Sequence, residues 1–208
     1  MTTYQHERRE QRGRPVSPTG RLLPREAPDL RARQDAYLDR RGLDPFTARF
    51  NGWYPSTGAG DSAARIVIPA APAGLGFWQA RAMDPEEPKR YQSPRADRAN
   101  AVIVVYSLRA MVKRLVVCEG PMDALAAATT GSTGIALMGN TPPGVCFDYI
   151  AARWPGAETL VVPDRDAQAA GAQWLAELTQ REMRARLVIL PAKDLAALSP
   201  SARTEALR

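Results

Sequence analysis

The sequence predicts an α/β fold in which a parallel sheet flanked by helices follows a small mixed α/β subdomain. From residue 113 onward, short apolar runs that are typical of buried strands alternate with helical segments. Between residues 53 and 106, β-branched and aromatic residues instead indicate strands joined by turns. Several of the downstream runs stop abruptly at carboxylates, which places acidic groups at one edge of the expected sheet.

The N-terminal region predicts a tail followed by two helices. Residues 1–27 are rich in arginine, proline, glutamate and glutamine, and they cannot bury enough apolar surface to offset the entropy lost on ordering. We therefore expect a flexible basic tail. Residues 29–50 then predict two helices, with Gly42 as a stop for the first. Asp44 before Pro45 is typical of an N-cap with proline at the first helical position.

The next region predicts a hairpin and a loop. Residues 65–69 and 75–81 are strand-like and are joined by a turn of alanine, proline and glycine. The prolines of residues 84–94 exclude a helix, so we expect a loop whose side chains suit phosphate binding.

The downstream region predicts alternating strands and helices. The expected strands lie at about residues 114–118, 134–138, 159–163 and 186–190. The expected helices lie at about residues 122–130, 144–153 and 167–183. Crossovers of this spacing are right-handed and produce a parallel sheet. The residues after 198 indicate either a short helix or a disordered end.

Composition narrows the class of protein. The chain carries 28 basic and 22 acidic residues, a net charge of +6, and only three of the basic residues are lysine. An arginine excess suits phosphate and nucleic-acid binding, although GC-rich coding would produce it equally well. Two cysteines 28 positions apart and a single histidine exclude a zinc site built from this chain alone. No apolar run approaches the ~20 residues that cross a bilayer and no signal peptide is present, so we expect a soluble, cytoplasmic protein without membrane contact.

Four carboxylates follow three of the predicted strands. Glu119 comes after the first strand, Asp164 and Asp166 after the third, and Asp194 after the fourth. Ligands of open α/β sheets bind beyond the carboxyl ends of the strands, where these side chains would meet. Gathered carboxylates repel one another unless a hard cation such as Mg²⁺ binds between them. The pattern therefore predicts metal-assisted chemistry on phosphates.

These motifs resemble the Toprim domain, which DnaG-type bacterial primases share with type IA and II topoisomerases and some nucleases. Glu119-Gly120 is similar to the glutamate motif of that domain, and Asp164-x-Asp166 is similar to its acidic pair. The upstream half narrows the resemblance to DnaG-type primases and their phage relatives, through residues 37–43, 65–69, 76–82, 89–94 and 119–123. The resemblance covers roughly residues 30–195.

The resemblance implies a primase core that makes RNA primers for DNA replication. Such a core is a nucleotidyltransferase that joins ribonucleoside triphosphates on a single-stranded DNA template with Mg²⁺ or Mn²⁺. Asp164, Asp166 and Asp194 would hold metal at the α-phosphate. Glu119 would bind metal or accept the proton of the attacking 3′-hydroxyl, and Asp123 would support the metal shell one helical turn further on.

The expected nucleic-acid and nucleotide contacts are basic or polar residues near the same site. They are Arg65, Arg81, Lys89, Arg90, Tyr91, Asn140 and Lys193. Most of the singled-out residues also have an ordinary structural interpretation. Glu119 and Asp123 would suit a first helical turn, Asp194 an N-cap, the two hairpin arginines a solvated sheet edge, and Asn140 a turn. The tryptophans at 53, 78, 154 and 174 are expected in the core.

Some positions depart from the primase pattern. Arg165 stands where glycine is frequent, Ala169 replaces another glycine, and Ala196 replaces a second carboxylate. The zinc-binding and helicase-binding domains of bacterial primases are also missing from the sequence. The resemblance therefore implies a phage- or plasmid-like core that obtains template recognition from a replicative helicase or from a separate zinc-binding protein.

These considerations give an expected domain organisation. A flexible tail at 1–27 precedes a basic primase-like subdomain at 28–111, a Toprim catalytic subdomain at 112–198 and a C-terminal tail at 199–208. Two other functions use the same residues. One is a Toprim nuclease that cuts DNA with these carboxylates, and the other is a non-catalytic DNA-binding primase subunit.

Overall fold

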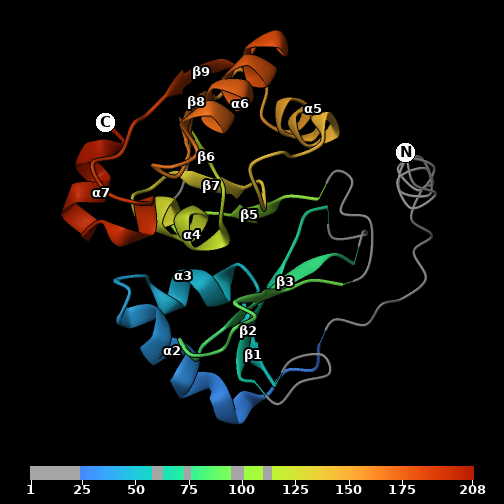
Figure 1. Ribbon diagram of the computed structural model, residues 1–208, viewed down its shortest axis with the longest axis vertical. Coiled ribbons are helices and arrows are strands. Elements are labelled where there is room, and N and C mark those ends of the chain that lie inside the picture. Colours follow the sequence, from blue (N-terminus) through green and yellow to red (C-terminus); the bar gives the residue numbers. More distant parts are fainter. Residues whose placement is uncertain (1–23, 58–62, 73–75, 95–100, 110–113) are drawn as a thin grey trace.

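The protein has two parts, each built on its own sheet. The computed structural model describes residues 24–57, 63–72, 76–94, 101–109 and 114–208. Figure 1 shows a smaller N-terminal part beneath a C-terminal part that has helices on both faces of its sheet. This architecture confirms the expected α/β fold class. Residues 1–23, most of the expected tail, lie outside the described residues.

The N-terminal helices begin and end where their sequence signals predict. They are η2 (Pro28–Leu30), α2 (Arg31–Asp39) and α3 (Pro45–Phe50). Gly42 follows α2 with a φ of 61°, the left-handed conformation that favours glycine. The Asp44 carboxylate accepts hydrogen bonds from the backbone N–H groups of Phe46 at 3.1 Å and Thr47 at 2.9 Å, which confirms the cap.

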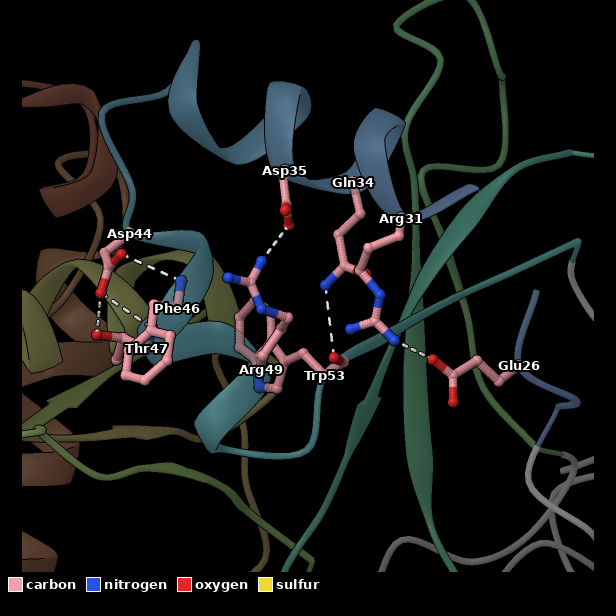
Figure 2. A network of polar contacts seen from close by, with 9 residues as sticks. All are labelled: Glu26, Arg31, Gln34, Asp35, Asp44, Phe46, Thr47, Arg49 and Trp53. Atoms are coloured by element: carbon pink, nitrogen blue, oxygen red, sulfur yellow. Dashed lines mark hydrogen bonds and ion pairs between the residues drawn. The ribbon is translucent and has the colours of Figure 1, made fainter. Parts of the chain in front are cut away.

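Polar contacts fix α2 against α3 and the first sheet (Figure 2). The Arg49 Nη1 atom lies 2.6 Å from the Asp35 Oδ1 atom and joins the two helices. The Gln34 side chain, which is buried, donates to the carbonyl oxygen of Trp53 at 3.4 Å. An ion pair between Arg31 and Glu26 holds the segment that leads into α2. The helices are therefore anchored to the sheet by more than apolar packing.

The first sheet is antiparallel and contains the predicted hairpin. Its strands, in spatial order, are β1 (Tyr54–Ser56), β2 (Arg65–Pro69), β3 (Trp78–Ala82) and β4 (Tyr91–Gln92). The expectation that residues 84–94 form only a loop was wrong for β4, where Tyr91 pairs with Arg81. The prolines of this segment flank the short strand, so its pairing is not interrupted by a missing N–H donor.

The second sheet is mostly parallel. Its strands are β5 (Ile103–Val105), β6 (Arg114–Cys118), β7 (Thr133–Ala136), β8 (Glu158–Val162) and β9 (Arg184–Leu187). Their spatial order is β5-β7-β6-β8-β9, with β6 to β9 parallel as predicted. The antiparallel edge strand β5 was not foreseen, because three residues carry too little periodicity to identify a strand.

Helices cover both faces of the second sheet. They are α4 (Pro121–Thr129), α5 (Gly144–Arg153), α6 (Gln168–Gln180), η4 (Leu195–Ala197) and α7 (Pro200–Ala206). Alternate residues of the central strand face opposite sides, because side chains alternate along a strand. Val116 and Cys118 join a core that extends through α4 to Ile66 and Ile68 of the first sheet. Leu115 and Val117 instead face the core under α5 and α6, the helices on the side of the second sheet opposite α4 in Figure 1.

The C-terminal residues pack against the shared core. The residues that we assigned to a tail form α7, whose following residue Leu207 is buried in the shared core. Trp53, Trp78 and Trp174 are buried as predicted, while Trp154 is only partly buried. None of the helices in the described part of the chain is long and apolar enough to cross a membrane.

Candidate active site

A cavity of about 340 Å³ lies between the N-terminal and C-terminal parts. The C-terminal part contributes the acidic residues Glu119, Asp123, Asp164 and Asp194. The N-terminal part contributes the aromatic and basic residues Tyr37, Arg41, Arg81, Arg90 and Tyr91. We call these two groups the acidic wall and the basic wall of the cavity. An acidic wall opposite a basic wall is an arrangement that can bind a metal–phosphate complex.

Strand topology produces the acidic wall. The adjacent parallel strands β6 and β8 pair with Cys118 opposite Val162, so both strands end at the same edge. Glu119 directly follows β6, and Asp164 follows β8 after one intervening proline. The two carboxylates therefore emerge side by side from distant parts of the sequence.

The electrostatics show that these carboxylates are close together. Burial, followed by the charges of Glu119, Asp194 and Asp166, raises the pKa of Asp164 to about 6. Burial and the charge of Asp166 raise the pKa of Glu119. Asp166 itself is exposed and does not line the cavity, so it acts on the acidic wall from outside. Carboxylates that raise one another's pKa in this way favour a bound cation, because the cation offsets their repulsion.

Asp123 is the most buried member of the acidic wall, and it joins α4 to η4. Its side chain is buried, and its Oδ1 atom accepts a hydrogen bond from the Ala196 backbone N–H at 2.9 Å. Burial raises the pKa of Asp123 to about 7, and the charges of Asp194 and Asp164 act in the same direction. The Ala196 hydrogen bond and the charge of Arg41 oppose this rise. Asp123 therefore supports the segment that carries Asp194.

We expect Asp123 to make the folded state less stable as pH rises. The folded-state pKa of about 7 lies above the ordinary value of 3.8, so the protonated form stabilises the fold at low pH and this contribution is lost as pH rises through 7. The variant Asp123→Asn keeps the acceptor for Ala196 and removes the charge. Between pH 5 and pH 8, the wild type should lose about 2 to 3 kcal/mol of unfolding free energy relative to Asp123→Asn.

Urea unfolding at both pH values, with a chelator present, measures this difference. A buffered divalent cation should reduce it, because the cation stabilises the charged forms of the neighbouring carboxylates. Parallel pH dependences for the wild type and Asp123→Asn would contradict the assignment of a raised pKa to this carboxyl.

Asp194 caps a helix and lines the cavity at once. Its Oδ1 atom accepts the Ala197 backbone N–H at 2.8 Å at the start of η4, which confirms the structural interpretation of this residue. The same side chain belongs to the acidic wall. The adjacent Lys193 also lines the cavity, and its charge lowers the pKa of Asp164. Its carbonyl oxygen accepts the Arg165 N–H at 2.8 Å, which ties the loop after β8 to this segment.

The basic wall is held together by contacts between arginine and tyrosine. The Arg81 Nε atom donates to the Tyr37 hydroxyl at 3.0 Å. The Arg81 guanidinium lies 4.8 Å from the centre of the Tyr91 ring, within cation–π range. Burial raises the pKa of Tyr91 to about 12, against the opposing charge of Arg81. The Tyr91 phenol therefore stays protonated at neutral pH and can donate a hydrogen bond.

Three of the residues expected to contact nucleic acid lie away from the cavity. The fully buried Arg65 donates to the Lys89 carbonyl oxygen at 2.8 Å and pairs with Glu87 at 3.3 Å. It therefore anchors the loop and is not a solvated edge charge, because its side chain points inward from β2. Lys89 is exposed but does not line the cavity. Asn140 also lies outside it and accepts the Trp174 indole N–H through its backbone carbonyl at 3.0 Å.

Sequence reasoning missed other cavity residues. Tyr37, Arg41, Asp84 and Met122 all line the cavity. Tyr37 lies in the last turn of α2, and Arg41 lies in the turn that follows this helix. The Arg41 guanidinium lies 5.8 Å from the centre of the Tyr37 ring, and its buried Nε atom has no hydrogen-bond partner within the described part of the chain.

The departures from the primase pattern have structural explanations at two positions. A Cβ atom at Gly171 would lie 2.5 Å from Pro163 Cγ, so this glycine allows α6 to pack closely on the end of β8. The exposed Ala169 is not needed for this approach. The Ala196 backbone N–H binds Asp123, and its small side chain is buried, where a second carboxylate would have to be desolvated.

The acidic wall fits a hard divalent cation whose coordination shell is completed by waters and substrate phosphates. In the described ranges, no three His, Cys, Asp or Glu side chains form a ready-made metal cluster. Mg²⁺ is usually held by one or two carboxylates together with waters and substrate phosphates, so a complete protein cage is not required. The raised pKa values of Asp164 and Glu119 indicate carboxylates that a cation would stabilise in their charged forms.

Comparison with known proteins finds similarity in structure and not in sequence. No known family profile matches the sequence, and no curated protein sequence matches it. The primase fragment of the bacteriophage T7 primase-helicase protein matches with a TM-score of 0.61 and 16% identity, over 82% of this chain and 71% of that chain. The Aquifex aeolicus primase fragment, with zinc-binding and RNA polymerase domains, matches with a TM-score of 0.65 and 14% identity, over 84% of this chain and 54% of that one.

A DnaG primase catalytic domain bound to single-stranded DNA matches with a TM-score of 0.61 and 17% identity, over 85% of this chain and 69% of that chain. The two-part architecture is thus a Toprim-type α/β fold preceded by a small mixed subdomain. More specifically, the chain has the fold of the catalytic cores of DnaG-type primases. It spans about half of the Aquifex fragment.

Proposed function

We propose that the protein is a DnaG-like primase core that joins ribonucleotides on a single-stranded DNA template. The observation that carries this proposal is the cavity, in which strand-end carboxylates lie across from arginine side chains of the N-terminal part. The fold supports it, because a structurally similar DnaG catalytic domain binds single-stranded DNA and the T7 fragment comes from a primase-helicase. Template recognition would then come from a helicase or from a zinc-binding protein.

The acidic wall would supply the chemical step. A bound Mg²⁺ or Mn²⁺ would polarise the α-phosphate of the incoming nucleotide, and Asp164 and Asp194 would hold it there, supported by the charge of Asp166. Glu119 is suited to accept the proton of the attacking 3′-hydroxyl, because burial and the charge of Asp166 raise its pKa and a higher pKa makes a carboxylate a stronger base. Asp123 would keep Asp194 in position through the Ala196 N–H.

The basic wall would hold phosphates of template and nucleotide. Arg81 and Arg90 of the basic wall line the cavity, and Lys193 lines it from the C-terminal part beside Asp194. Arginine presents several donors in a planar fork that matches phosphate oxygens. Phosphate contacts fix orientation without reading base sequence, so this core alone would show little template preference.

A Toprim nuclease would use the same carboxylates, so the two functions differ in what lies across the cavity. The similarity to primase cores covers 82–85% of this chain in the three comparisons and therefore includes the N-terminal part that forms the basic wall. This coverage favours primer synthesis over DNA cleavage.

Primer synthesis is the direct test. Labelled ribonucleotides are supplied with varied single-stranded DNA templates and Mg²⁺ or Mn²⁺, with a candidate helicase present or omitted. We expect short RNA products that a chelator abolishes. Metal-dependent DNA cleavage without ribonucleotide incorporation would indicate the nuclease, and DNA binding without any divalent-dependent product would indicate a non-catalytic subunit.

Neighbouring loop residues offer a matched test of the basic wall. Arg90 and Lys89 are both exposed, but only Arg90 lines the cavity. We expect Arg90→Gln to weaken binding of single-stranded DNA about three- to tenfold and to reduce the slope of log K against log salt by about 0.7, the value for one lost phosphate contact. Lys89→Gln should change affinity less than about twofold. Fluorescence anisotropy at several salt concentrations measures both, and equal effects would contradict the proposed phosphate path.

A further inference from the structure

Arg203 of α7 is a buried arginine whose hydrogen-bond acceptors, among the residues that the structure describes, are backbone carbonyl oxygens. Its exposed fraction is only 1%, and its guanidinium donates four hydrogen bonds. A buried charge is costly unless its donors are satisfied, so these bonds are required for the side chain to lie there. Apolar packing alone does not explain why a charged side chain lies at this position of α7.

The four carbonyl oxygens belong to two separate segments. On one side, Arg203 donates to Leu195 at 3.2 Å and to Ala196 at 2.8 Å, both in η4. On the other side, it donates to Gly42 at 2.6 Å and to Arg41 at 3.1 Å, in the turn between α2 and α3. Gly42 is 161 positions away in the sequence, so the guanidinium bridges the N-terminal and C-terminal parts.

Both segments carry cavity residues. Arg41 belongs to the basic wall, and its Nε atom lacks a partner among the residues that the structure describes. Asp194 directly precedes η4 and belongs to the acidic wall. The Ala196 residue that offers its carbonyl to Arg203 also offers its N–H to Asp123. The bridge therefore joins a segment that carries a cationic cavity residue to a segment that carries an anionic one.

The helix that carries Arg203 is itself attached to the second sheet. Arg114 of β6 donates to the Leu207 carbonyl oxygen, and Arg186 of β9 donates to the Arg208 carbonyl oxygen at 3.0 Å. The Leu207 side chain is buried in the shared core. The position of α7 therefore follows the sheet whose strand ends carry the acidic wall.

We propose that Arg203 is a positioning residue that holds the two walls of the cavity in register, so that Arg41 and the cation held by Asp194 act on the same bound phosphates. This inference rests on the proposed function for its catalytic consequence but not for the bridge itself. A planar guanidinium reaches carbonyl oxygens on both sides at once, whereas a lysine ammonium offers its donors from a single point. The helix α7 would thus contribute to catalysis by positioning residues of the cavity.

The test compares Arg203→Met and Arg203→Lys with the control Arg181→Met. Arg181 also donates to backbone carbonyl oxygens, those of Gly144 and Glu177, but all of its partners lie in the C-terminal part and away from the cavity. The first measurement is amide hydrogen exchange, which reports local opening. In Arg203→Met, residues 41–43 and 195–197 should both exchange at least about tenfold faster, while residues 114–118 and 158–162 stay unchanged. Arg181→Met should leave all four segments unchanged.

The second measurement is steady-state primer synthesis. Arg203→Met should lower kcat at least about tenfold while KM for the nucleotide changes less than about threefold, because misalignment of the reacting groups costs rate more than binding. Arg203→Lys keeps the charge but loses the fork, so it should restore less than about half of the lost rate. A merely structural role would lower the amount of folded enzyme, and kcat calculated per folded molecule would then stay at the wild-type value.

The outcomes separate the inference from the function on which it rests. Unchanged exchange in both segments, or uniform acceleration along the chain, would overturn the bridge, and unchanged kcat with accelerated exchange would overturn the positioning role. If Arg203→Met does not fold, Arg203→Lys decides by the same criteria. Wild-type protein that makes no primer counts against the proposed function, and the exchange measurement still decides whether the bridge exists.

Discussion

Replacing Asp164 with asparagine is expected to lower kcat for primer synthesis by at least about a hundredfold, while template affinity changes less than about threefold. Asp164 follows β8 at the centre of the acidic wall, where the charges of Glu119, Asp194 and Asp166 all act on it. A metal-bound carboxylate contributes several kcal/mol to the stabilisation of charge in the transition state, and each ~1.4 kcal/mol corresponds to a factor of ten in rate. Under the proposed function, the template contacts would come mainly from the basic wall and should remain.

The same substitution should not destabilise the fold. The pKa of Asp164 is raised to about 6, which means that its charged form is disfavoured where it lies. Asparagine has nearly the same shape and carries no charge, so Asp164→Asn relieves repulsion on the acidic wall. Thermal unfolding in a chelator at pH 8 should therefore show a Tm equal to or above that of the wild type.

A matched control separates the effect of losing the Asp164 carboxylate from the effect of losing a negative charge elsewhere on the protein. Asp148 lies on α5 and pairs with Arg181 at 2.7 Å, and it does not line the cavity. Asp148→Asn should keep kcat within about twofold of the wild type, because exposed ion pairs contribute little. Single-turnover incorporation with both variants gives the comparison. An Asp164→Asn enzyme with more than about a third of the wild-type rate would exclude this carboxylate from metal binding.

The acidic wall could be predicted from sequence because it depends on local pattern and simple topology. An apolar run that ends at a carboxylate marks the end of a buried strand, and neighbouring parallel strands end at one edge. Glu119 and Asp164 therefore had to lie close together once β6 and β8 were adjacent. The caps of α3 and η4 were predictable for the same reason, since Asp44 and Asp194 act on backbone groups within three residues.

The basic wall was only partly predictable, because the direction of a side chain depends on packing. Arg65 and Arg81 both lie in strands of the hairpin, yet one is buried against the Lys89 carbonyl oxygen while the other lines the cavity. Nothing in the local sequence distinguishes them. The bridge made by Arg203 was less accessible still, since its backbone carbonyl partners leave no signature in the sequence.

Gly134→Ala is expected to destabilise the protein by about 3 kcal/mol or more, the largest effect that we predict for a single methyl group. A Cβ atom at Gly134 would lie 2.0 Å from the Ala124 carbonyl oxygen and 2.5 Å from its carbonyl carbon. Contact distances between carbon and other heavy atoms are normally about 3.5 Å, so the helix has to move. The obstruction is backbone, which cannot rotate away as a side chain would.

The close approach at Gly134 is part of how the cavity is built. Gly134 lies on β7, and the facing helix α4 presents small buried residues from Ala124 to Ala128, interrupted only by Leu125. This helix carries Asp123 in its first turn, one residue before the contact. Displacing α4 from the sheet would therefore shift Asp123 away from the Ala196 N–H as well as expose apolar surface. Loss of stability and loss of activity should appear together in this variant.

Gly144→Ala provides the control for Gly134→Ala. Gly144 opens α5, and a Cβ atom there would lie 3.6 Å from the Arg181 Nη2 atom, an ordinary contact. Alanine in a helix is favoured over glycine by up to about 1 kcal/mol, so this variant should be neutral or slightly more stable. Thermal unfolding should show a fall in Tm of roughly 6–12 °C for Gly134→Ala and no fall for Gly144→Ala. Equal Tm values for the two variants would mean that β7 and α4 do not approach as closely as the cavity requires.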